Sequence, residues 1–276
     1  HVCVELERFA DAPVLDLDGN PVGDRRWPNL PAWRDALARS PLVGDGSRIT
    51  PLVLGARERL YLARYFQHEQ RLAELIRARA RFSDEALDAG ALRDALGRLF
   101  THPAPDYQRI AAEVAVVRAL TVISGGPGTG KTSTVVKILA LLVENALACG
   151  RSAPRVALLA PTGKAATRLG EAITRAKASL PCRPEVLEGI PEAPSTIHRG
   201  LGAHGEGGTR FSKGRESPLV ADVVVVDESS MVDVALMRRL LEAVSPRARM
   251  ILLGGEHQLE KVALQPHHQH LAFGIA

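Results

Sequence analysis

A glycine-rich run that ends in a Lys-Thr pair has the residue types that bind a polyphosphate: Gly125-Gly126-Pro127-Gly128-Thr129-Gly130-Lys131-Thr132. It follows a short β-branched run at 121–124 and precedes an apolar, helix-like stretch. Glycines let backbone N–H groups turn toward an anion, because no Cβ blocks the approach. The N-terminus of the following helix adds unpaired N–H donors. We expect Lys131 to contact the β- and γ-phosphates and the Thr132 hydroxyl to hold Mg²⁺. The alternative, a glycine-rich turn with a chance Lys-Thr pair, leaves the strand–loop–helix context unexplained.

Two acids, Asp227 and Glu228, directly follow the four valines at 223–226. Ligands of open α/β sheets bind beyond the carboxyl ends of the strands, so we expect both acids to lie near the phosphate loop. Asp227 would hold Mg²⁺, directly or through water, and Glu228 would orient and deprotonate an attacking water. Such a pair suits hydrolysis better than transfer to a second substrate. The alternative is a helix N-terminus, where acidic residues are favoured by the helix dipole.

Four continuous apolar runs separated by helical segments predict the sheet that must position these groups; they lie at 120–123, 156–159, 223–226 and 250–253. Continuous apolar strands indicate a parallel sheet covered on both faces. The predicted fold class is therefore α/β, a P-loop NTPase sheet of the RecA-like type with helices on both faces. The Gly- and Pro-rich stretch at 189–217 is predicted to be a loop-rich insertion.

The first 104 residues predict a small, mainly helical N-terminal domain. A hairpin is expected from the runs 52–54 and 59–62 around Gly55, followed by helices at 65–81 and 86–100. The Pro-containing stretch at 101–105 is typical of a linker. We therefore divide the chain into residues 1–104, a motor domain over 105–260, and a divergent tail over 261–276.

The composition of the 276 residues constrains the class of protein. Aromatic residues make up only 4%, which predicts an aliphatic core, and the net charge of +4 permits a polyanionic partner without requiring one. Cys3, Cys149 and Cys182 are widely separated and include no C-x-x-C pair, which argues against zinc or a disulfide framework and fits a reducing cytosol. No apolar run has the length of a membrane span. Early acidic residues do not resemble a secretory signal, so we expect a cytoplasmic protein that has no membrane partner. Because the chain begins with His1, we expect that it could be a fragment.

A series of motifs in a fixed order resembles superfamily 1 DNA helicases and, more narrowly, the RecD family, the alpha subunits of bacterial exodeoxyribonuclease V. The series runs from Gln108 and GGPGTGKT through APTGKAA at 160–166 and STIHR at 195–199 to VDESSM at 226–231, then LLG at 252–254 and Gln258-Leu259. The segment RLYLARYF at 59–66 resembles the part of RecD that precedes its motor. The resemblance covers nearly all of residues 1–259.

The resemblance implies a role for each matching position. Gln108 matches a glutamine that reads adenine, so ATP is expected to be preferred over GTP, and Lys131, Glu228 and Gln258 match catalytic groups, with Gln258 sensing the γ-phosphate. Thr132 and Asp227 match the Mg²⁺ ligands. The expected ATP-binding residues are Gln108, Gly125, Gly126, Pro127, Gly128, Thr129, Gly130, Lys131, Thr132 and Ser133. The residues expected to border single-stranded DNA are Pro161, Thr162, Lys164, Thr196 and His198. From spacing alone, the APTGK run reads equally well as a turn with a helix start, and His198 as a surface histidine.

Two departures qualify these expectations. The family pattern has an aspartate after LLG and another just before the glutamine, where this chain has Gly255 and His257, and the sequence stops resembling the family from Glu260 onward. The His-rich cluster at 267–270 is expected to be part of a tail rather than a metal site. A second motor domain, which the family uses to supply arginines to the transition state, is also missing. We therefore expect this chain alone to bind Mg-ATP weakly and to hydrolyse it very slowly, with Lys131 facing solvent when no nucleotide is bound.

Three functional hypotheses follow. The first is a RecD-type motor that moves 5′→3′ on single-stranded DNA within a helicase–nuclease complex for double-strand break repair, with RecB- and RecC-like partners that bind its N-terminal part. The second is a stand-alone helicase of the same superfamily. The third is an inactive remnant that only binds nucleotide or partners. We find no spaced Asp/Glu/Lys cluster of a nuclease, so nuclease activity would belong to a partner.

Overall fold

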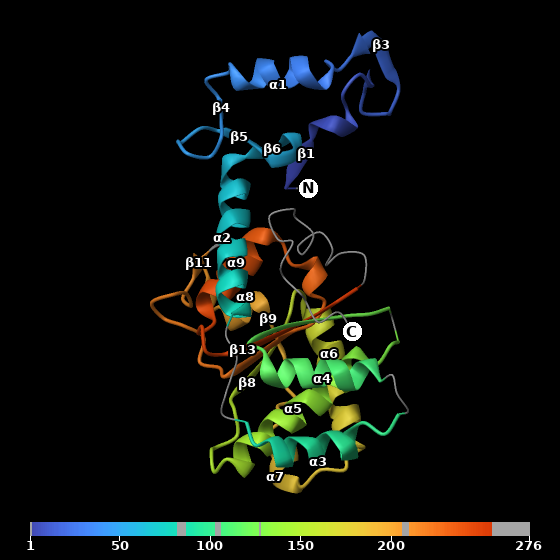
Figure 1. The fold of residues 1–276 in the computed structure, drawn as a ribbon, viewed down its shortest axis with the longest axis vertical. Helices are drawn as coiled ribbons and strands as arrows, with labels where there is room; N and C mark the ends of the chain where they lie inside the picture. The colour runs from blue at the N-terminus through green and yellow to red at the C-terminus, as the bar shows by residue number, and fades with distance from the viewer. Residues whose placement is uncertain (1, 82–86, 103–105, 127, 206–209, 256–276) are drawn as a thin grey trace. The chain divides into compact units, whose positions relative to one another are not determined.

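The computed structural model describes all residues except 1, 82–86, 103–105, 127, 206–209 and 256–276 (Figure 1). The chain divides into two compact units, His1–Ala73 and Glu74–Ala276. Among the described residues, no helix is both long and apolar enough to cross a membrane.

The first unit is built on short strands. Its sheet has the order β1 (Cys3–Glu5), β6 (Arg59–Leu62), β5 (Leu52–Gly55) and β4 (Val43–Gly44), while β2 (Pro13–Leu15) and β3 (Pro21–Arg26) form a separate ribbon. The predicted hairpin is present, because β5 and β6 pair antiparallel in a register that joins Leu52 to Leu62. The buried apolar residues of this unit are Leu6, Val43, Val53, Tyr61 and Leu72, three of them on the strands of this sheet.

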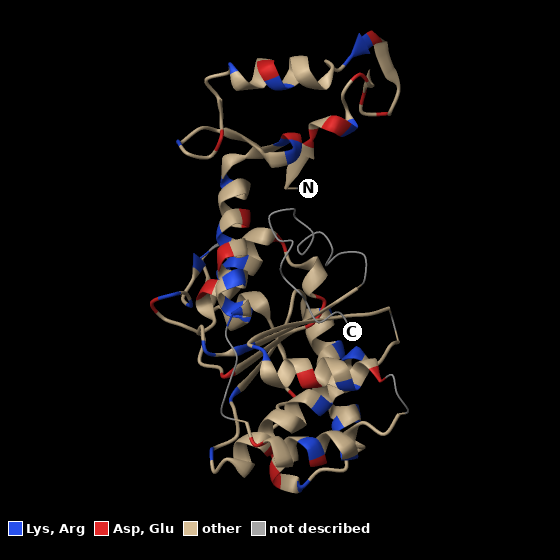
Figure 2. Cartoon of the chain, in the orientation of Figure 1, with Lys and Arg blue, Asp and Glu red and all other residues tan. Residues whose placement is uncertain are grey.

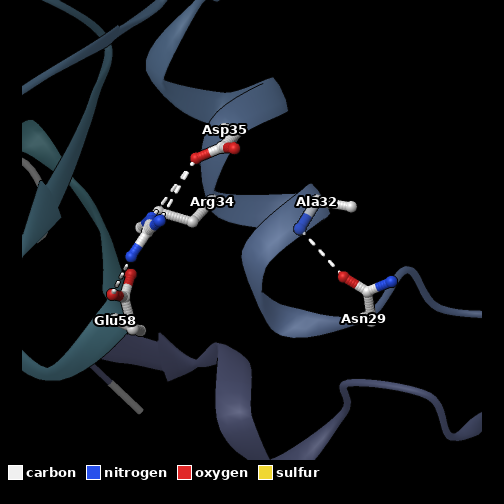
Figure 3. A network of polar contacts seen from close by, with 5 residues as sticks. All are labelled: Asn29, Ala32, Arg34, Asp35 and Glu58. Carbon is white, nitrogen blue, oxygen red and sulfur yellow. Dashed lines mark hydrogen bonds and ion pairs between the residues drawn. The ribbon is translucent and has the colours of Figure 1, made fainter.

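Helix α1 (Leu30–Ala38) lies on the surface of the first unit and buries none of its side chains. Asn29 begins it by accepting a hydrogen bond from the Ala32 N–H at 2.9 Å (Figure 3). Arg34 then forms ion pairs with Asp35 at 3.3 Å and with Glu58 at 3.9 Å. Glu58 lies in the β5–β6 turn in a left-handed conformation with φ of 52°, which is uncommon for a residue with a Cβ. These exposed ion pairs contribute little stability. The apolar contact of α1 is the Trp33 ring, which stacks on the Trp27 ring with 5.0 Å between their centroids.

The second unit contains the predicted parallel sheet, with the order β7 (Leu120–Ser124), β13 (Arg249–Gly254), β12 (Val223–Val226), β8 (Val156–Ala160) and β9 (Ser195–Thr196). Every pairing in it is parallel. All four strands expected from apolar runs are present. The short fifth strand, β9, was not expected, because a two-residue strand inside a loop-rich stretch carries no apolar run.

Helices cover both faces of this sheet, as predicted. Figure 1 shows α3 (Ala89–Leu99), α4 (Tyr107–Val117) and α5 (Lys131–Ala148) on one side and α9 (Val234–Ala243) on the other. The remaining helices of the unit are α6 (Gly163–Ala178), α7 (Pro184–Glu188) and α8 (Ile197–Gly200). Acidic and basic residues alternate along α3 and α4, as Figure 2 shows, which fits a solvated outer layer.

The division between the units lies about 30 residues before the predicted boundary at 104. Helix α3 belongs to the second unit, because Leu96, Leu99 and Phe100 are buried in the same core as α5. The buried Asn145 side chain of α5 also accepts a hydrogen bond from the Asp88 N–H at 2.9 Å. Of the helices expected in residues 1–104, α3 and the last turns of α2 (Ala63–Ala80) therefore lie in the second unit, and the first unit combines its short strands with α1 and the first turns of α2. The Pro-containing stretch at 101–105 is thus a connection inside the second unit.

The stretch predicted as a loop-rich insertion, 189–217, contains short elements. It holds β9, α8 and a two-stranded ribbon of β10 (Ala203–His204) and β11 (Arg210–Phe211). Their shortness explains why periodicity did not reveal them.

Candidate nucleotide and DNA site

The phosphate loop connects the end of β7 to the first residue of α5, Lys131. Gly128 and Gly130 have φ of 79° and 81°, a left-handed conformation that glycine adopts without cost. A Cβ at Gly130 would lie 2.7 Å from the Gln108 side-chain nitrogen, and a Cβ at Gly125 would lie 2.8 Å from the Thr129 hydroxyl. The loop therefore needs glycine for both its conformation and its close contacts.

Lys131 is half-buried, and its ammonium is bonded within the loop. Its Nζ donates to the carbonyls of Gly125 at 2.6 Å and Gly126 at 2.8 Å. From the sequence we expected this side chain to face solvent. In the structure it is half-buried and bonded to carbonyls of its own loop. The cause is the tight turn of the loop, which brings the carbonyl oxygens of Gly125 and Gly126 to the lysine at the start of the helix. A bound polyphosphate would have to replace those oxygens as the acceptor.

The two predicted acids follow β12 at the carboxyl end of the sheet on which the loop lies. Strand β13 separates β12 from β7, and all three run parallel, so Asp227 and the loop lie at the same edge. Burial raises the pKa of Asp227, the nearby charge of Glu228 raises it further, and the Lys131 ammonium acts in the opposite direction. The two groups, 96 residues apart in the sequence, therefore lie at the same edge of the sheet.

Glu228 is exposed and has an unusual backbone. Its φ of 48° and ψ of 40° are left-handed, which costs on the order of 1–3 kcal/mol in a residue other than glycine. Its N–H donates to the Asp227 carboxylate at 2.9 Å. The next residue, Ser229, is buried and donates its hydroxyl to the Leu253 carbonyl of β13 at 2.7 Å. Sequence reasoning missed Ser229, because a serine after two acids carries no distinctive signal.

The oxygen atoms of Thr132 and Asp227 fit the predicted Mg²⁺ site. Magnesium prefers hard oxygen ligands and one or two carboxylates beside substrate phosphates. The half-buried Asp227 carboxylate has lost much of its hydration, as its raised pKa indicates, so a divalent cation would stabilise its charged form. Among the described residues, no group of three or more His, Cys, Asp or Glu forms a separate metal cluster.

Gln108 lies against the phosphate loop. Asp106 begins α4 by accepting from the N–H groups of Gln108 and Arg109, at 3.0 and 3.1 Å. The Gln108 Nε2 then donates to the Thr129 carbonyl at 3.1 Å. The predicted base-reading residue and the phosphate loop, 17 or more residues apart in the sequence, are therefore in direct contact.

The residues predicted to border DNA gather at the ends of β8 and β9. These strands pair in parallel with Ala160 opposite Thr196, so the segments that follow them lie side by side. Thr162 caps α6 through a bond from the Ala165 N–H, and Thr196 caps α8 through a bond from the Arg199 N–H, each at 3.2 Å. Both hydroxyls thus already have a structural role.

Other groups at this edge are free to meet a ligand. Pro161 precedes the capping threonine and is partly exposed, whereas Lys164 is exposed on the first turn of α6. The exposed His198 ring lies 5.8 Å from the Phe211 ring of β11. Among the described residues, no ion pair engages Lys164, Arg168 or Arg175 of α6.

A groove of about 720 Å³ runs between α6 and the segment 192–199. Its walls include Gly163, Thr167, Arg175, Thr196 and Arg199. It reaches the predicted DNA edge through Thr196 but does not include the phosphate loop. Two of the predicted site residues, Pro127 and Gln258, lie outside the described residues, as do the tail and its histidines.

Comparison with known families decides the classification. The profile of the AAA domain family matches residues 108–264, more than half of the chain. The chain belongs to the AAA domain family. A second profile, that of the N-terminal domain of RecBCD enzyme subunit RecD, matches residues 1–61.

Relatives of this AAA-domain chain confirm the resemblance to RecD. The chain is 42% identical to "RecBCD enzyme subunit RecD" of Mycolicibacterium smegmatis over 95% of its own length and 44% of the relative's. It is also 42% identical to the protein of that name from Mycobacterium tuberculosis, covering 95% of this chain and 42% of the relative. "ATP-dependent RecD2 DNA helicase" of Deinococcus radiodurans is 36% identical over 74% of this chain and 25% of the relative. The chain thus spans less than half the length of these relatives.

Solved structures are more distant. T4 UvsW aligns with a TM-score of 0.43 and 10% identity, covering 62% of this chain and 35% of that structure. The P-loop α/β fold follows instead from the parallel sheet, its flanking helices and the AAA domain match.

Proposed function

We propose that this chain is the ATP-binding part of a 5′→3′ DNA helicase motor, the RecD-type subunit of a bacterial helicase–nuclease complex that acts in double-strand break repair and recombination in the cytoplasm. The observation that carries the proposal is the convergence of the phosphate loop, Asp227 and Glu228 at one edge of one sheet. The similarity to RecD over 95% of the chain supports the choice of motor, and the 5′→3′ polarity is what the resemblance to this family implies.

Each group has a task in this proposal. Loop amides and Lys131 bind the β- and γ-phosphates, and Gln108 binds the base. Thr132 and Asp227 would hold Mg²⁺, which when bound neutralises charge on the phosphates. Glu228, exposed at the end of the buried strand, takes a proton from the attacking water.

The same edge of the sheet offers a path for single-stranded DNA. Lys164 and the neighbouring cations of α6 lie beside the capped N-termini of α6 and α8, where backbone N–H groups and a basic side chain can hold successive phosphates. Pro161, Thr162, Thr196 and His198 border this path. ATP-driven changes at Asp227 and Glu228 would then act on DNA held at neighbouring strand ends of the same sheet.

The first unit supports the choice of a subunit over a stand-alone helicase. Large apolar side chains remain exposed on it, among them Phe9, Leu15, Leu17, Leu42 and Ile49. In this proposal these side chains are covered by a protein partner. The match of residues 1–61 to the RecD N-terminal domain points to RecB- and RecC-like subunits as the partners.

The test measures ligand binding by the 276-residue chain with calorimetry. We expect Mg-ATP and a single-stranded oligothymidylate to bind, and Lys131→Ala to abolish the nucleotide signal while leaving the DNA signal. Lys137→Ala is the matched control, because this lysine of the same helix lies over the Phe100 ring, 4.6 Å from its centroid. Unchanged ATP affinity in Lys131→Ala would refute the site. Failure of the chain to co-elute with RecB- and RecC-like subunits would refute the choice of complex.

A further inference from the structure

Gln108 contacts the phosphate loop, whereas a residue that only reads a base needs no such contact. Its Nε2 donates to the Thr129 carbonyl at 3.1 Å, and the same nitrogen would lie only 2.7 Å from a Cβ at Gly130. Gln108 therefore touches both residues of one peptide unit, the unit that directly precedes Lys131.

The contact with Gln108 orients the whole peptide unit between Thr129 and Gly130. In a trans peptide the C=O and the following N–H point in opposite directions. Because Gln108 holds the Thr129 carbonyl, it also fixes the direction of the Gly130 N–H, on the opposite side of the peptide from Gln108. Gly130 has φ of 81°, a flexible position at which the peptide could otherwise rotate.

Gln108 is also linked to Lys131. The Thr129 hydroxyl donates to the Gly126 carbonyl at 2.9 Å, and that carbonyl also accepts from Lys131 Nζ at 2.8 Å. A hydrogen-bonded chain thus runs from Gln108 through Thr129 and Gly126 to Lys131. Any change at Gln108 alters the support of the residues that cradle the phosphates.

We propose that Gln108 is a positioning residue for the phosphate loop, so that it sets the affinity for the triphosphate itself as well as for the base. The inference rests on the proposed function, in which this loop binds a nucleoside triphosphate. It predicts that binding of a base to the Gln108 amide alters the hydrogen bonding of Lys131 through Thr129 and Gly126.

The experiment compares a ligand with a base and one without. Affinities of the chain for Mg-ATP and for Mg-tripolyphosphate are measured by calorimetry in wild type, Gln108→Met and Gln108→Glu. Methionine keeps the length of the side chain and removes the donor, and glutamate places an oxygen against the Thr129 carbonyl. The matched control is Ile110→Ala, an exposed position on the same helix turn. Unfolding midpoints are recorded to confirm that each variant is folded.

We expect Gln108→Met to weaken tripolyphosphate binding about threefold to tenfold, the effect of losing one neutral hydrogen bond, and Gln108→Glu to weaken it more. ATP should weaken by at least the same factor, with Ile110→Ala within twofold of wild type. Tripolyphosphate affinity within twofold of wild type in both Gln108 variants would overturn the inference, whether or not ATP binding falls. A wild-type chain that binds neither ligand would overturn the proposed function and this inference together.

Discussion

The buried guanidinium of Arg79 provides a quantitative test of how the second unit is held together. Arg79 lies in the last turn of α2, inside the second unit, and only 6% of its surface is exposed. Its Nη1 donates to the carbonyls of Ala248 at 2.6 Å and Ser245 at 3.1 Å, and its Nη2 donates to the Val244 carbonyl at 2.9 Å. Arg79 thus caps the C-terminus of α9 and fixes the turn that leads into β13.

Replacing Arg79 by methionine keeps most of the volume and removes all three donors. A hydrogen bond to a charged group contributes about 1.5–3 kcal/mol, and a buried carbonyl left without a partner costs about 1–3 kcal/mol. Burial lowers the pKa of Arg79, so part of this gain is offset by the cost of desolvating the charge. We expect a net destabilisation of about 2–4 kcal/mol, relative to wild type, in the free energy of unfolding.

The assay is urea unfolding followed by circular dichroism at 222 nm. With a slope of about 2–3 kcal/mol per molar urea, the midpoint should fall by about 1 M. Both tryptophans, Trp27 and Trp33, lie in the first unit, so their fluorescence follows that unit and should change less. Arg81→Met, at an exposed neighbouring position, is the control. A loss below about 1 kcal/mol in Arg79→Met would refute the reasoning, because the loss of three charged hydrogen bonds would then cost no more than one ordinary hydrogen bond.

Three further predictions concern the site. Ser229→Ala should lower the free energy of unfolding by about 1–2 kcal/mol, because it removes the hydrogen bond to the Leu253 carbonyl. In the same urea assay the control Ser230→Ala should change it by less than about 0.5 kcal/mol, and equal effects of the two variants would contradict the role of the buried bond. Asp227→Asn should stabilise the nucleotide-free chain at pH 7, because burial raises the pKa of this carboxyl above 3.8 and the charged form is disfavoured in the fold. The wild-type carboxyl contributes stability below its unfolded pKa and loses it as pH rises through the folded value, so the advantage of asparagine should vanish in thermal melts near pH 3; a constant difference across pH would disprove the assignment. Steady-state ATP hydrolysis by the 276 residues alone should be very slow, since an arginine from a second domain is worth about 10³–10⁵ in rate, and turnover equal to that of an intact helicase would contradict this.

Much of the second unit could be predicted because its signals are local and strong. The four valines before Asp227 and the apolar run before the phosphate loop mark strands that are buried on both faces, and such runs have few other interpretations. The glycine-rich loop was recognisable because glycine, lysine and threonine are each required at fixed positions. The sequence also placed Asp227 correctly at the end of its strand.

Other features depend on contacts that no local pattern records. The prolines at 101–105 suggested a boundary there, whereas the compact units divide after Ala73, and Leu96 and Leu99 are buried in the same core as α5. The engagement of Lys131 by loop carbonyls follows from the tight turn, which a motif does not describe. The contact of Gln108 with Thr129 joins residues from two elements whose distance in space depends on how α4 packs on α5.

The most direct test of the account is the effect of Mg²⁺ on ATP affinity in wild type and in Asp227→Ala. If the loop and the acid hold one triphosphate–metal pair, Mg²⁺ should strengthen ATP binding in wild type, and the alanine variant should lose most of that gain while still binding metal-free ATP. A gain from Mg²⁺ that is the same in both proteins would contradict the account, because Asp227 would then take no part in the site formed by the phosphate loop.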